Sequence, residues 1–573
     1  MLTDDQEKAL HGILNFIQTP ITDFKDCATL LYSAAGAGKT FLTRYIADKL
    51  RNKYIIAGVA PTHKARKVLH NFLNNKFETE ENSFLTVSLN NFVTIKTMTV
   101  AGLLGKLRNH SYIGTHNYVE TQSKIKDFNI FIIDEASMIN NEDIKKIISY
   151  AFDYKRKLIF VGDKYQIPNP VQNYIYDKEF AYKADSCVFN IPGFELTTNI
   201  RQKEGNPIIP IYWELRNAIV ENREANINRE NLMKDGKGVK FYTNRDQWYE
   251  QMKETYHNIG NNSKSQEMIV RQNKSNNYQL HHYKVIAYTN DAVKTHNNIV
   301  RKLFSRGDKP EVGELLMGYN NIGFPEPYVS NGQDYYILSI SETSTHRILD
   351  YPNLVGFFIN TKESDTNIQA KLFVINIAHK NNKNILHELV KRGEKVNSNY
   401  STKQDYKIYY EIRNRIIFME NIYKIENEIL GETQFRLTHP SLFKNLNEVV
   451  DYNRSLLLNN KLKNDIEEKY GSILDERLKD NKSFSEVERI SDRFLVIEKD
   501  IDYGYSITTH KSQGSTYKTV FIDEVDFEKL RDNYNYKLGC KVKTVKEKNQ
   551  LKYVSYTRPT DGAYVLYREI IPE

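Results

Sequence analysis

The first 190 residues alternate short apolar runs with longer segments of helical periodicity. The runs are ATLLYSA, YIIAGVA, IFIIDEA and KLIFVGD. Strands that are apolar on both faces are typical of a parallel sheet with helices on each side. A second series begins at residue 283, with YKVIAYTN, GYSITTH, KTVFIDEVD and GAYVLYREI. The two series predict an α/β fold with two doubly wound lobes.

The pattern changes between about residues 335 and 385. The segments DYYILSISET, LVGFFINT and AKLFVINIA alternate apolar and polar residues, which predicts antiparallel strands and a small β barrel. From about residue 386 to 495 the chain is charged and helical in pattern, most simply a solvated helical surface. The polar residues 258–280 predict a long surface loop.

Composition narrows the class of protein only mildly. The net charge of +8 suits a phosphate-backbone partner, and a well-solvated surface would explain it equally well. The three cysteines lie far apart without CxxC spacing, which argues against a disulfide framework, a zinc site or an iron–sulfur cluster. No stretch approaches the roughly 20 apolar residues that span a bilayer, and the polar start does not resemble a signal peptide. We therefore expect a cytoplasmic protein without membrane association, in the host cytoplasm if a phage encodes it.

The strongest motif is SAAGAGKT, residues 33–40, which follows an apolar run and precedes a helical segment. In that context small residues let successive backbone N–H groups surround phosphates at a helix N-terminus. Lys39 would reach the β- and γ-phosphates of ATP, and the Thr40 hydroxyl would bind Mg²⁺. Ser33 replaces the glycine that usually opens this motif, so we expect an altered loop entry and a retained site. The alternative is a chance glycine-rich turn.

Two further apolar runs end in polar residues that complete a nucleotide site. IFII ends in Asp134, which would hold Mg²⁺ mostly through water, and Glu135, a candidate general base. LIFVGD leads into Gln166 within GDKYQIP. Each is weak alone, because polar strand ends are usually just solvated, but together with the P-loop they indicate an ATPase.

The ordered set of motifs resembles the Dda/RecD-like branch of the superfamily 1B DNA helicases. The matching segments, besides the three above, are LTDDQ, APTHKA, TVAGLL, LTTNIRQ, AYTN, TTHKSQGST and YVSYTR, with GELLM and NGQ before the predicted barrel. The resemblance implies two RecA-like motor domains, with a small β-hairpin insertion in the first and an SH3-like β barrel plus a helical insertion in the second. We therefore expect a first motor domain at 1–190 with its hairpin at about 105–126, a second at 191–335 and 498–573, and the inserted barrel and helical extension at 336–497.

The resemblance also implies roles for individual residues. Gln166 would sense the γ-phosphate, Arg201 and Arg558 would act as arginine fingers, and Lys39 and Glu135 complete the catalytic set. The nucleotide contacts would be Gln6 at the adenine edge, the loop residues Ala35, Gly36, Ala37, Gly38, Lys39, Thr40 and Phe41, and Gln513 and Gly514 from the second lobe.

Single-stranded DNA would lie across both lobes, and the resemblance implies that the protein moves 5′ to 3′ along it. The expected contacts are Pro61, Thr62, His63, Thr99, Asn290, Thr508, His510 and Lys511. For His63 and His510 the alternative is a structural turn histidine. Tyr112 or Tyr118 in the hairpin could meet the fork, and a plain solvated hairpin tip is an equal alternative.

The expected partners are single-stranded and fork DNA, with single-strand-binding protein or replisome components as further candidates, in replication or recombination. We expect a monomer. Two other functions stay open: a DNA-stimulated translocase that strips bound proteins without separating strands, and an RNA helicase. A catalytically inactive binding module is disfavoured by the intact ATPase motifs.

Overall fold

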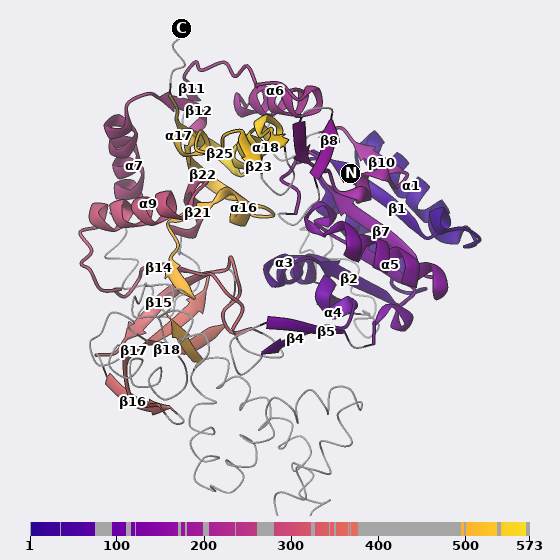
Figure 1. Ribbon diagram of the computed structural model, residues 1–573, viewed down its shortest axis with the longest axis horizontal. Coiled ribbons are helices and arrows are strands. Elements are labelled where there is room, and N and C mark those ends of the chain that lie inside the picture. Colours follow the sequence, from indigo (N-terminus) through magenta and orange to yellow (C-terminus); the bar gives the residue numbers. More distant parts are fainter. Residues whose placement is uncertain are drawn as a thin grey trace, which may run out of the picture.

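The structure is a computed structural model with three larger β-sheets and two smaller ones (Figure 1). It describes residues 2–34, 36–74, 94–110, 116–120, 122–169, 174–177, 180–198, 206–234, 236–260, 280–322, 327–342, 344–348, 351–364, 366, 368–375, 494–497, 500–535 and 540–568. The predicted helical extension and most of the predicted loop at 258–280 lie outside these ranges. So do Ala35, Tyr112 and Arg201.

The first lobe is built on a six-stranded sheet in the order β10-β1-β7-β6-β2-β3, and every neighbouring pair is parallel. Consecutive residues of a strand point to opposite faces. Leu30 and Phe131 therefore belong to one core, and Leu31 and Ile132 belong to a second core on the other face. This double burial is the physical reason why the central strands β1, β2, β6 and β7 are mainly apolar, whereas the edge strands β3 and β10 carry exposed and polar residues. The strands are β1 (Ala28–Ser33), β2 (Ile56–Ala60), β3 (Lys96–Thr99), β6 (Ile130–Ile133), β7 (Lys157–Gly162) and β10 (Gly193–Leu196), and the helices are α1 (Asp4–Gln18), α2 (Lys39–Leu50), α3 (His63–Asn74), α4 (Val100–Leu103) and α5 (Asn141–Asp153).

The second lobe is built on another six-stranded sheet, in the order β11-β12-β25-β22-β13-β21. Only β11 runs antiparallel to its neighbour in this sheet. The last described strand, β25, lies between β12 and β22, so the C-terminal part of the chain completes the middle of the sheet. The strands are β11 (Leu232–Lys234), β12 (Lys237–Tyr242), β13 (Tyr283–Ala287), β21 (Ser506–Thr508), β22 (Tyr517–Asp523) and β25 (Pro559–Leu566), and the helices are α6 (Ile208–Glu221), α7 (Arg245–Gly260), α9 (Asn290–Leu303), α16 (Thr509–Ser512), α17 (Glu524–Phe527) and α18 (Val545–Tyr556).

A third, seven-stranded sheet interrupts the second lobe and follows the order β19-β18-β17-β15-β14-β20, with β16 paired to β17. It is antiparallel except for the β18–β19 pair. The predicted antiparallel strands are therefore confirmed, while closure into an SH3-like barrel stays a prediction. The strands are β14 (Leu315–Gly318), β15 (Asp334–Ile340), β16 (Ser344–Ile348), β17 (Tyr351–Glu363), β18 (Gln369–Ile375), β19 (Phe494–Ile497) and β20 (Ile501–Tyr503).

Sheet membership differs from the expected domain limits at three strands. β10 lies beyond residue 190 and still pairs with β1, because its backbone continues the parallel ladder of the first lobe. β14 lies before residue 336, and β20 lies after residue 497. Both belong to the third sheet, because β14 pairs with β15 on one side and with β20 on the other.

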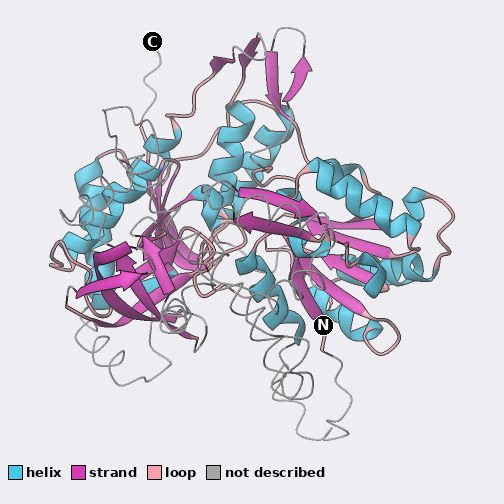
Figure 2. Cartoon of the chain, turned by 60° about the horizontal axis from the view of Figure 1, so that its bottom comes forward, coloured by secondary structure: helices cyan, strands magenta, loops and turns pink. Residues whose placement is uncertain are grey.

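Two smaller sheets use hairpins. β4 (Lys106–His110) and β5 (His116–Glu120) form the antiparallel hairpin that the resemblance implies between the third strand and β6. A four-stranded sheet in the order β23-β24-β9-β8 joins β8 (Tyr174–Asp177) and β9 (Phe180–Lys183) to β23 (Asn533–Asn535) and β24 (Cys540–Val542). Its strands rise above the helices at the top of the view in Figure 2. The 3₁₀ turns are η1 (Phe24–Asp26), η3 (Ile125–Asp127), η4 (Ala136–Met138), η5 (Cys187–Asn190) and η6 (Leu280–His282). None of the helices in the described part of the chain is long and apolar enough to cross a bilayer.

Candidate nucleotide cleft and nucleic-acid face

The P-loop connects β1 to α2, and two glycines give it its turns. Gly36 and Gly38 have φ angles of 88° and 77°, a left-handed conformation that favours glycine. Lys39 Nζ donates to Ser33 O at 3.1 Å, to Ser33 Oγ at 3.0 Å and to Ala34 O at 3.1 Å. The serine that replaces the usual first glycine therefore supplies an acceptor for Lys39.

Gln6 and Asp5 connect α1 to the rest of the first lobe. Gln6 is buried, its Oε1 accepts from Thr3 N at 3.1 Å, and its Nε2 donates to Ala37 O of the P-loop at 3.2 Å. Asp5 Oδ2 accepts from Thr197 N at 2.7 Å and from Thr198 N at 3.0 Å. The predicted adenine-reading segment is thus bonded both to the P-loop and to the segment that leads toward Arg201. The role of Asp5 was not predicted, because its partners lie almost 200 residues away.

Asp134 and Glu135 stand together where β6 ends. Glu135 has a φ of 50°, which strains a residue with a side chain. Burial and the neighbouring Asp134 charge raise the pKa of Glu135 to about 7, against the opposing effects of Lys39 and Arg558. Burial also raises the pKa of Asp134, against the effects of the Glu135 N–H and Lys39. A nearby positive charge would lower both pKa values, so two buried carboxyls beside one lysine favour the binding of a cation.

The loop after β7 carries Gln166 and reaches into the second lobe. Asp163 is fully buried and accepts from Tyr553 of α18, with a Tyr553 Oη–Asp163 Oδ2 distance of 2.9 Å. Tyr165 and Ile167 belong to the same hydrophobic core as Tyr553. Gln166 is buried, and its Oε1 has no hydrogen-bond partner among the described residues. An acceptor in that position suits a ligand that can donate to it, such as a water molecule.

Residues of the second lobe form the other side of the candidate nucleotide site. Gln513 Nε2 donates to Ile167 O at 3.0 Å. A Cβ added to Gly514, whose φ is 73°, would lie 3.2 Å from Glu135 Oε1. Arg558 is buried and donates to Ser515 O at 3.0 Å and to Val554 O at 2.9 Å, and its charge acts on Glu135. The structure thus brings Glu135, Gln513, Gly514 and Arg558 together across one cleft.

The predicted DNA contacts of the first lobe lie at helix starts. Thr62 Oγ1 accepts from Ala65 N at 3.1 Å at the start of α3, and Thr99 Oγ1 accepts from Gly102 N at 3.1 Å at the start of α4. Pro61 and His63 flank Thr62 and are partly exposed. The backbone of Tyr118 lies in β5, opposite Arg108. Both threonines act as helix caps, which keeps their loops in place.

Helix α3 also contacts the third sheet. Lys64 Nζ donates to Gly332 O at 2.6 Å. Lys67 forms an ion pair with Glu363, whose side chain is almost fully buried. The DNA-facing helix expected in the first lobe is thus fixed to the sheet that interrupts the second lobe.

The predicted DNA contacts of the second lobe gather around the start of α9 and α16. His510 lies beside Tyr288, with ring centroids 6.4 Å apart, and burial lowers the pKa of His510. Lys511 Nζ lies 3.2 Å from the centroid of the Tyr319 ring, and burial lowers the pKa of Lys511 to about 7. Thr508 is the N-cap residue of α16, and Asn290 is exposed at the start of α9.

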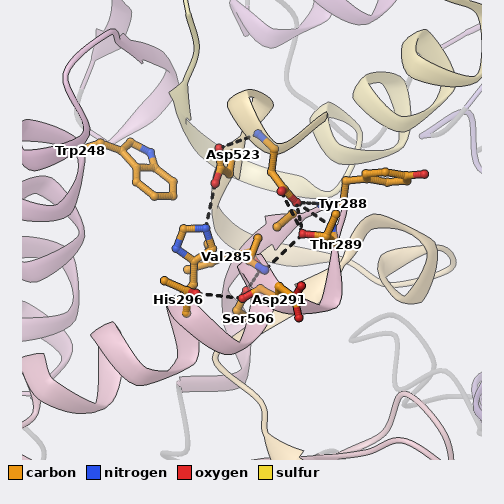
Figure 3. Close-up of polar contacts among 12 residues, drawn as sticks. Trp248, Val285, Tyr288, Thr289, Asp291, His296, Ser506 and Asp523 are labelled. Atoms are coloured by element: carbon orange, nitrogen blue, oxygen red, sulfur yellow. Dashed lines mark hydrogen bonds and ion pairs between the residues drawn. The ribbon is translucent and has the colours of Figure 1, made fainter. Parts of the chain in front are cut away.

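A polar network sets the loop that carries Asn290 (Figure 3). Asp526 accepts from Tyr288 N at 2.9 Å and from Thr289 N at 2.7 Å. His296 Nε2 lies 3.0 Å from Asp523 Oδ2 behind this loop. Asp526 was not predicted as a site residue, since the sequence does not show that α17 packs beside β13.

Comparisons with known proteins were consistent with this site. A family model described as an AAA domain matches residues 2–225. The uncharacterized protein R530 of Acanthamoeba polyphaga mimivirus is 23% identical over 516 residues, covering 87% of this chain and 89% of that protein. The ATP-dependent DNA helicase dda of Enterobacteria phage T4 is 26% identical over 364 residues, covering 60% of this chain and 70% of that protein.

Two solved structures are also similar to the chain at low scores. The Pif1 helicase from Candida albicans has a TM-score of 0.41 at 14% identity, covering 99% of this chain and 95% of that chain. The Pif1 helicase from Bacteroides in complex with ADP-AlF3 and ssDNA has a TM-score of 0.42 at 14% identity, covering 100% of this chain and 95% of that chain.

The fold and the P-loop identify an α/β protein with two parallel-sheet lobes and a phosphate-binding loop. The matched AAA domain, the similarity to the phage helicase and the ordered motifs make the chain similar to the Dda-like helicases of superfamily 1B.

Proposed function

We propose that the protein is an ATP-dependent DNA helicase that moves 5′ to 3′ along single-stranded DNA and separates duplex ahead of it. The observation that carries the proposal is the approach of the two lobes at Glu135 of the first lobe. A Cβ added to Gly514 of the second lobe would lie 3.2 Å from Glu135 Oε1, and the charge of Arg558 lowers the pKa of Glu135. A site divided between two lobes is complete only when they close, so hydrolysis can drive their relative motion.

Each residue of the cleft has a role in this proposal. Lys39 leaves Ser33 and Ala34 for the β- and γ-phosphates of ATP, and Glu135 accepts a proton from the attacking water. Arg558, together with Arg201, stabilises charge on the transferred phosphoryl group. Gln166 has a free acceptor with which to orient that water.

The donors present fit Mg²⁺. This ion prefers oxygen ligands and often takes only one or two from the protein, with substrate phosphates and water as the rest. Asp134 and Thr40 would supply a carboxylate and a hydroxyl, and a bound cation would lower the pKa of Asp134, which burial raises. When bound, Mg²⁺ neutralises charge on the phosphates.

Single-stranded DNA is proposed to cross the starts of α3 and α4 in the first lobe and of α9 and α16 in the second. Hydroxyl and backbone N–H groups at Thr62, Thr99 and Thr508 suit phosphates without reading sequence. His510 with Tyr288 and Lys511 with Tyr319 suit stacking and charge contacts to a single strand. Pro61, His63 and Asn290 flank this path, and the β4–β5 hairpin is the proposed strand separator.

A single chain supplies both walls of the cleft, so we expect the active species to be a monomer. Single-strand-binding and replisome proteins, and a cytoplasmic location, stay predictions.

The test is strand displacement on duplexes that carry either a 5′ or a 3′ single-stranded tail, of DNA or of RNA. We expect ATP-dependent displacement from the DNA 5′ tail, lost in Lys39→Ala and retained in Lys49→Ala. Lys49 is an exposed lysine on the same helix, α2, so the second variant controls for loss of charge.

Other results would change the conclusion. Displacement from the 3′ tail would overturn the direction, and displacement on RNA tracks alone would overturn the choice of substrate. ATP consumption on single strands without displacement would favour a translocase that strips bound proteins.

A further inference from the structure

The two lobes share a β-sheet outside the nucleotide cleft. β9 belongs to a hairpin that follows Gln166 in the first lobe, and β24 lies between β22 and α18 of the second lobe. The strands pair in parallel, with Phe180 opposite Lys541 and Ala181 opposite Val542. Lys543 N also donates to Ala181 O at 2.9 Å. The ladder is a backbone connection between segments about 360 positions apart.

Side chains on both sides reinforce the ladder. Ala181 and Val542 are buried. Lys183 Nζ lies 3.2 Å from Glu547 Oε1, and Lys546 Nζ lies 2.8 Å from Asp185 Oδ2. Lys543 Nζ also lies 3.9 Å from the centroid of the Phe180 ring. Each lobe supplies one lysine and one carboxylate, so the first lobe provides the positive charge in one ion pair and the negative charge in the other.

The position of the sheet relates it to catalysis. Helix α18 begins at Val545, directly after β24, and a helix of its length spans roughly 18 Å. Near its other end Tyr553 donates to Asp163 of the first lobe, and Arg558 follows the helix toward Glu135. The helix is therefore bonded to the first lobe at both ends. In Figure 1, the sheet lies between the lobes near α18, with β8 at one edge and β23 at the other.

We propose that this four-stranded sheet is a permanent joint between the lobes, and that it positions α18 so that Arg558 returns to Glu135 on every closure of the cleft. The inference rests on the proposed ATPase cleft and adds a positioning element outside it. Breaking the ladder would expose Ala181 and Val542 and leave backbone groups unpaired, which is costly. A connection at one side of the cleft turns the opening of the lobes into a rotation about that side.

The first test follows the ladder itself and does not depend on activity. Backbone hydrogen exchange is measured on the full chain, without nucleotide and with ADP–aluminium fluoride. We expect the amide of Lys543 to be equally protected in both states. Loss of its protection in either state would overturn the joint, because the pairing would then form and break during the cycle.

The second test reverses charge at one ion pair. Lys183→Glu places like charges beside each other, and we expect kcat of the DNA-stimulated ATPase to fall about tenfold while KM for ATP changes by less than about twofold. The substitution does not change the P-loop, so KM for ATP should stay nearly the same. The double variant Lys183→Glu/Glu547→Lys restores the attraction and should recover most of kcat.

Lys541→Glu is the matched control, because it makes the same charge change on an exposed side chain of β24. It should leave kcat within about twofold. If it lowers kcat as much as Lys183→Glu does, or if the double variant recovers nothing, the positioning role is refuted. Absence of ATPase activity in the wild-type protein would refute the proposed function instead, and the exchange test would still decide whether the joint exists.

Discussion

Glu135 gives the most direct test of the proposed general base. Its carboxyl is expected to be needed for ATP hydrolysis and, at the same time, to lower the stability of the folded protein as pH rises. Its pKa is raised to about 7 by burial and by Asp134, so the folded, nucleotide-free protein favours the neutral carboxyl. In the unfolded chain the same group ionises with a pKa of 4.5. As pH rises from 4.5 through 7 the folded state holds a proton that the unfolded state has released, so stability falls across that window.

Glu135→Gln replaces the carboxyl with a neutral group of the same shape, so the variant should not lose stability as pH rises through this window. A shift of about 2.5 units corresponds to at most about 3 kcal/mol, fully expressed at pH 8.5 and reduced to about 1 kcal/mol at pH 5. The variant should therefore unfold at a temperature up to about 6–12 °C above wild type at pH 8.5, for a unit of this size. At pH 5 the difference should shrink to a few degrees.

The assay is thermal unfolding of nucleotide-free protein at the two pH values, beside steady-state ATPase measurements. The variant should lose at least about a hundredfold in kcat, since an amide cannot accept the proton. Glu142→Gln is the control, because Glu142 is exposed in the same lobe. A thermal difference between Glu135→Gln and wild type that is equal at both pH values, or that grows toward pH 5, would refute the reasoning.

Two further substitutions test the contacts across the cleft. Gly514→Ala places a methyl group 3.2 Å from Glu135 Oε1 in a left-handed conformation, and steady-state kinetics should show kcat lower by about tenfold. Gly236→Ala has a similar φ of 74° with nothing within 4 Å, so an equal loss there would assign the effect to backbone strain. Tyr553→Phe leaves the buried Asp163 without one donor, and it should reduce stability by about 1–2 kcal/mol in denaturant unfolding and weaken DNA stimulation of the ATPase. Unchanged stimulation would contradict a coupling role.

The lobes and the P-loop could be predicted because their signals are local. The strands β6 and β7 are buried on both faces, so their residues are apolar apart from Lys157 at the start of β7, and a glycine-rich turn before a helix has few other uses. The same holds for Asp134 and Glu135, which stand at a strand end. These predictions did not depend on knowing which helices and strands pack against one another.

The contacts between distant segments could not be predicted. β9 and β24 are short and partly polar, so neither reads as a buried strand, and their pairing becomes visible only in space. Tyr553 belongs to the motif that carries Arg558, and nothing in that motif indicates that the Tyr553 hydroxyl donates to Asp163. Ser33 was expected to be a tolerated departure, and the structure gives it a bond to Lys39. The first two contacts depend on partners that lie far away in the sequence, and the third depends on how the P-loop folds back on itself, so none leaves a periodic pattern.

The parallel pairing of β18 and β19 has a consequence for how the chain can vary. β18 ends at Ile375 and the adjacent strand β19 begins at Phe494, and these two ends are offset by about three residues or roughly 10 Å along the pair. A parallel pair needs a crossover of only about a dozen residues. This position can therefore accept or lose a long insert while the neighbouring ladder stays closed, which makes it a natural graft point for fusing another domain to the motor.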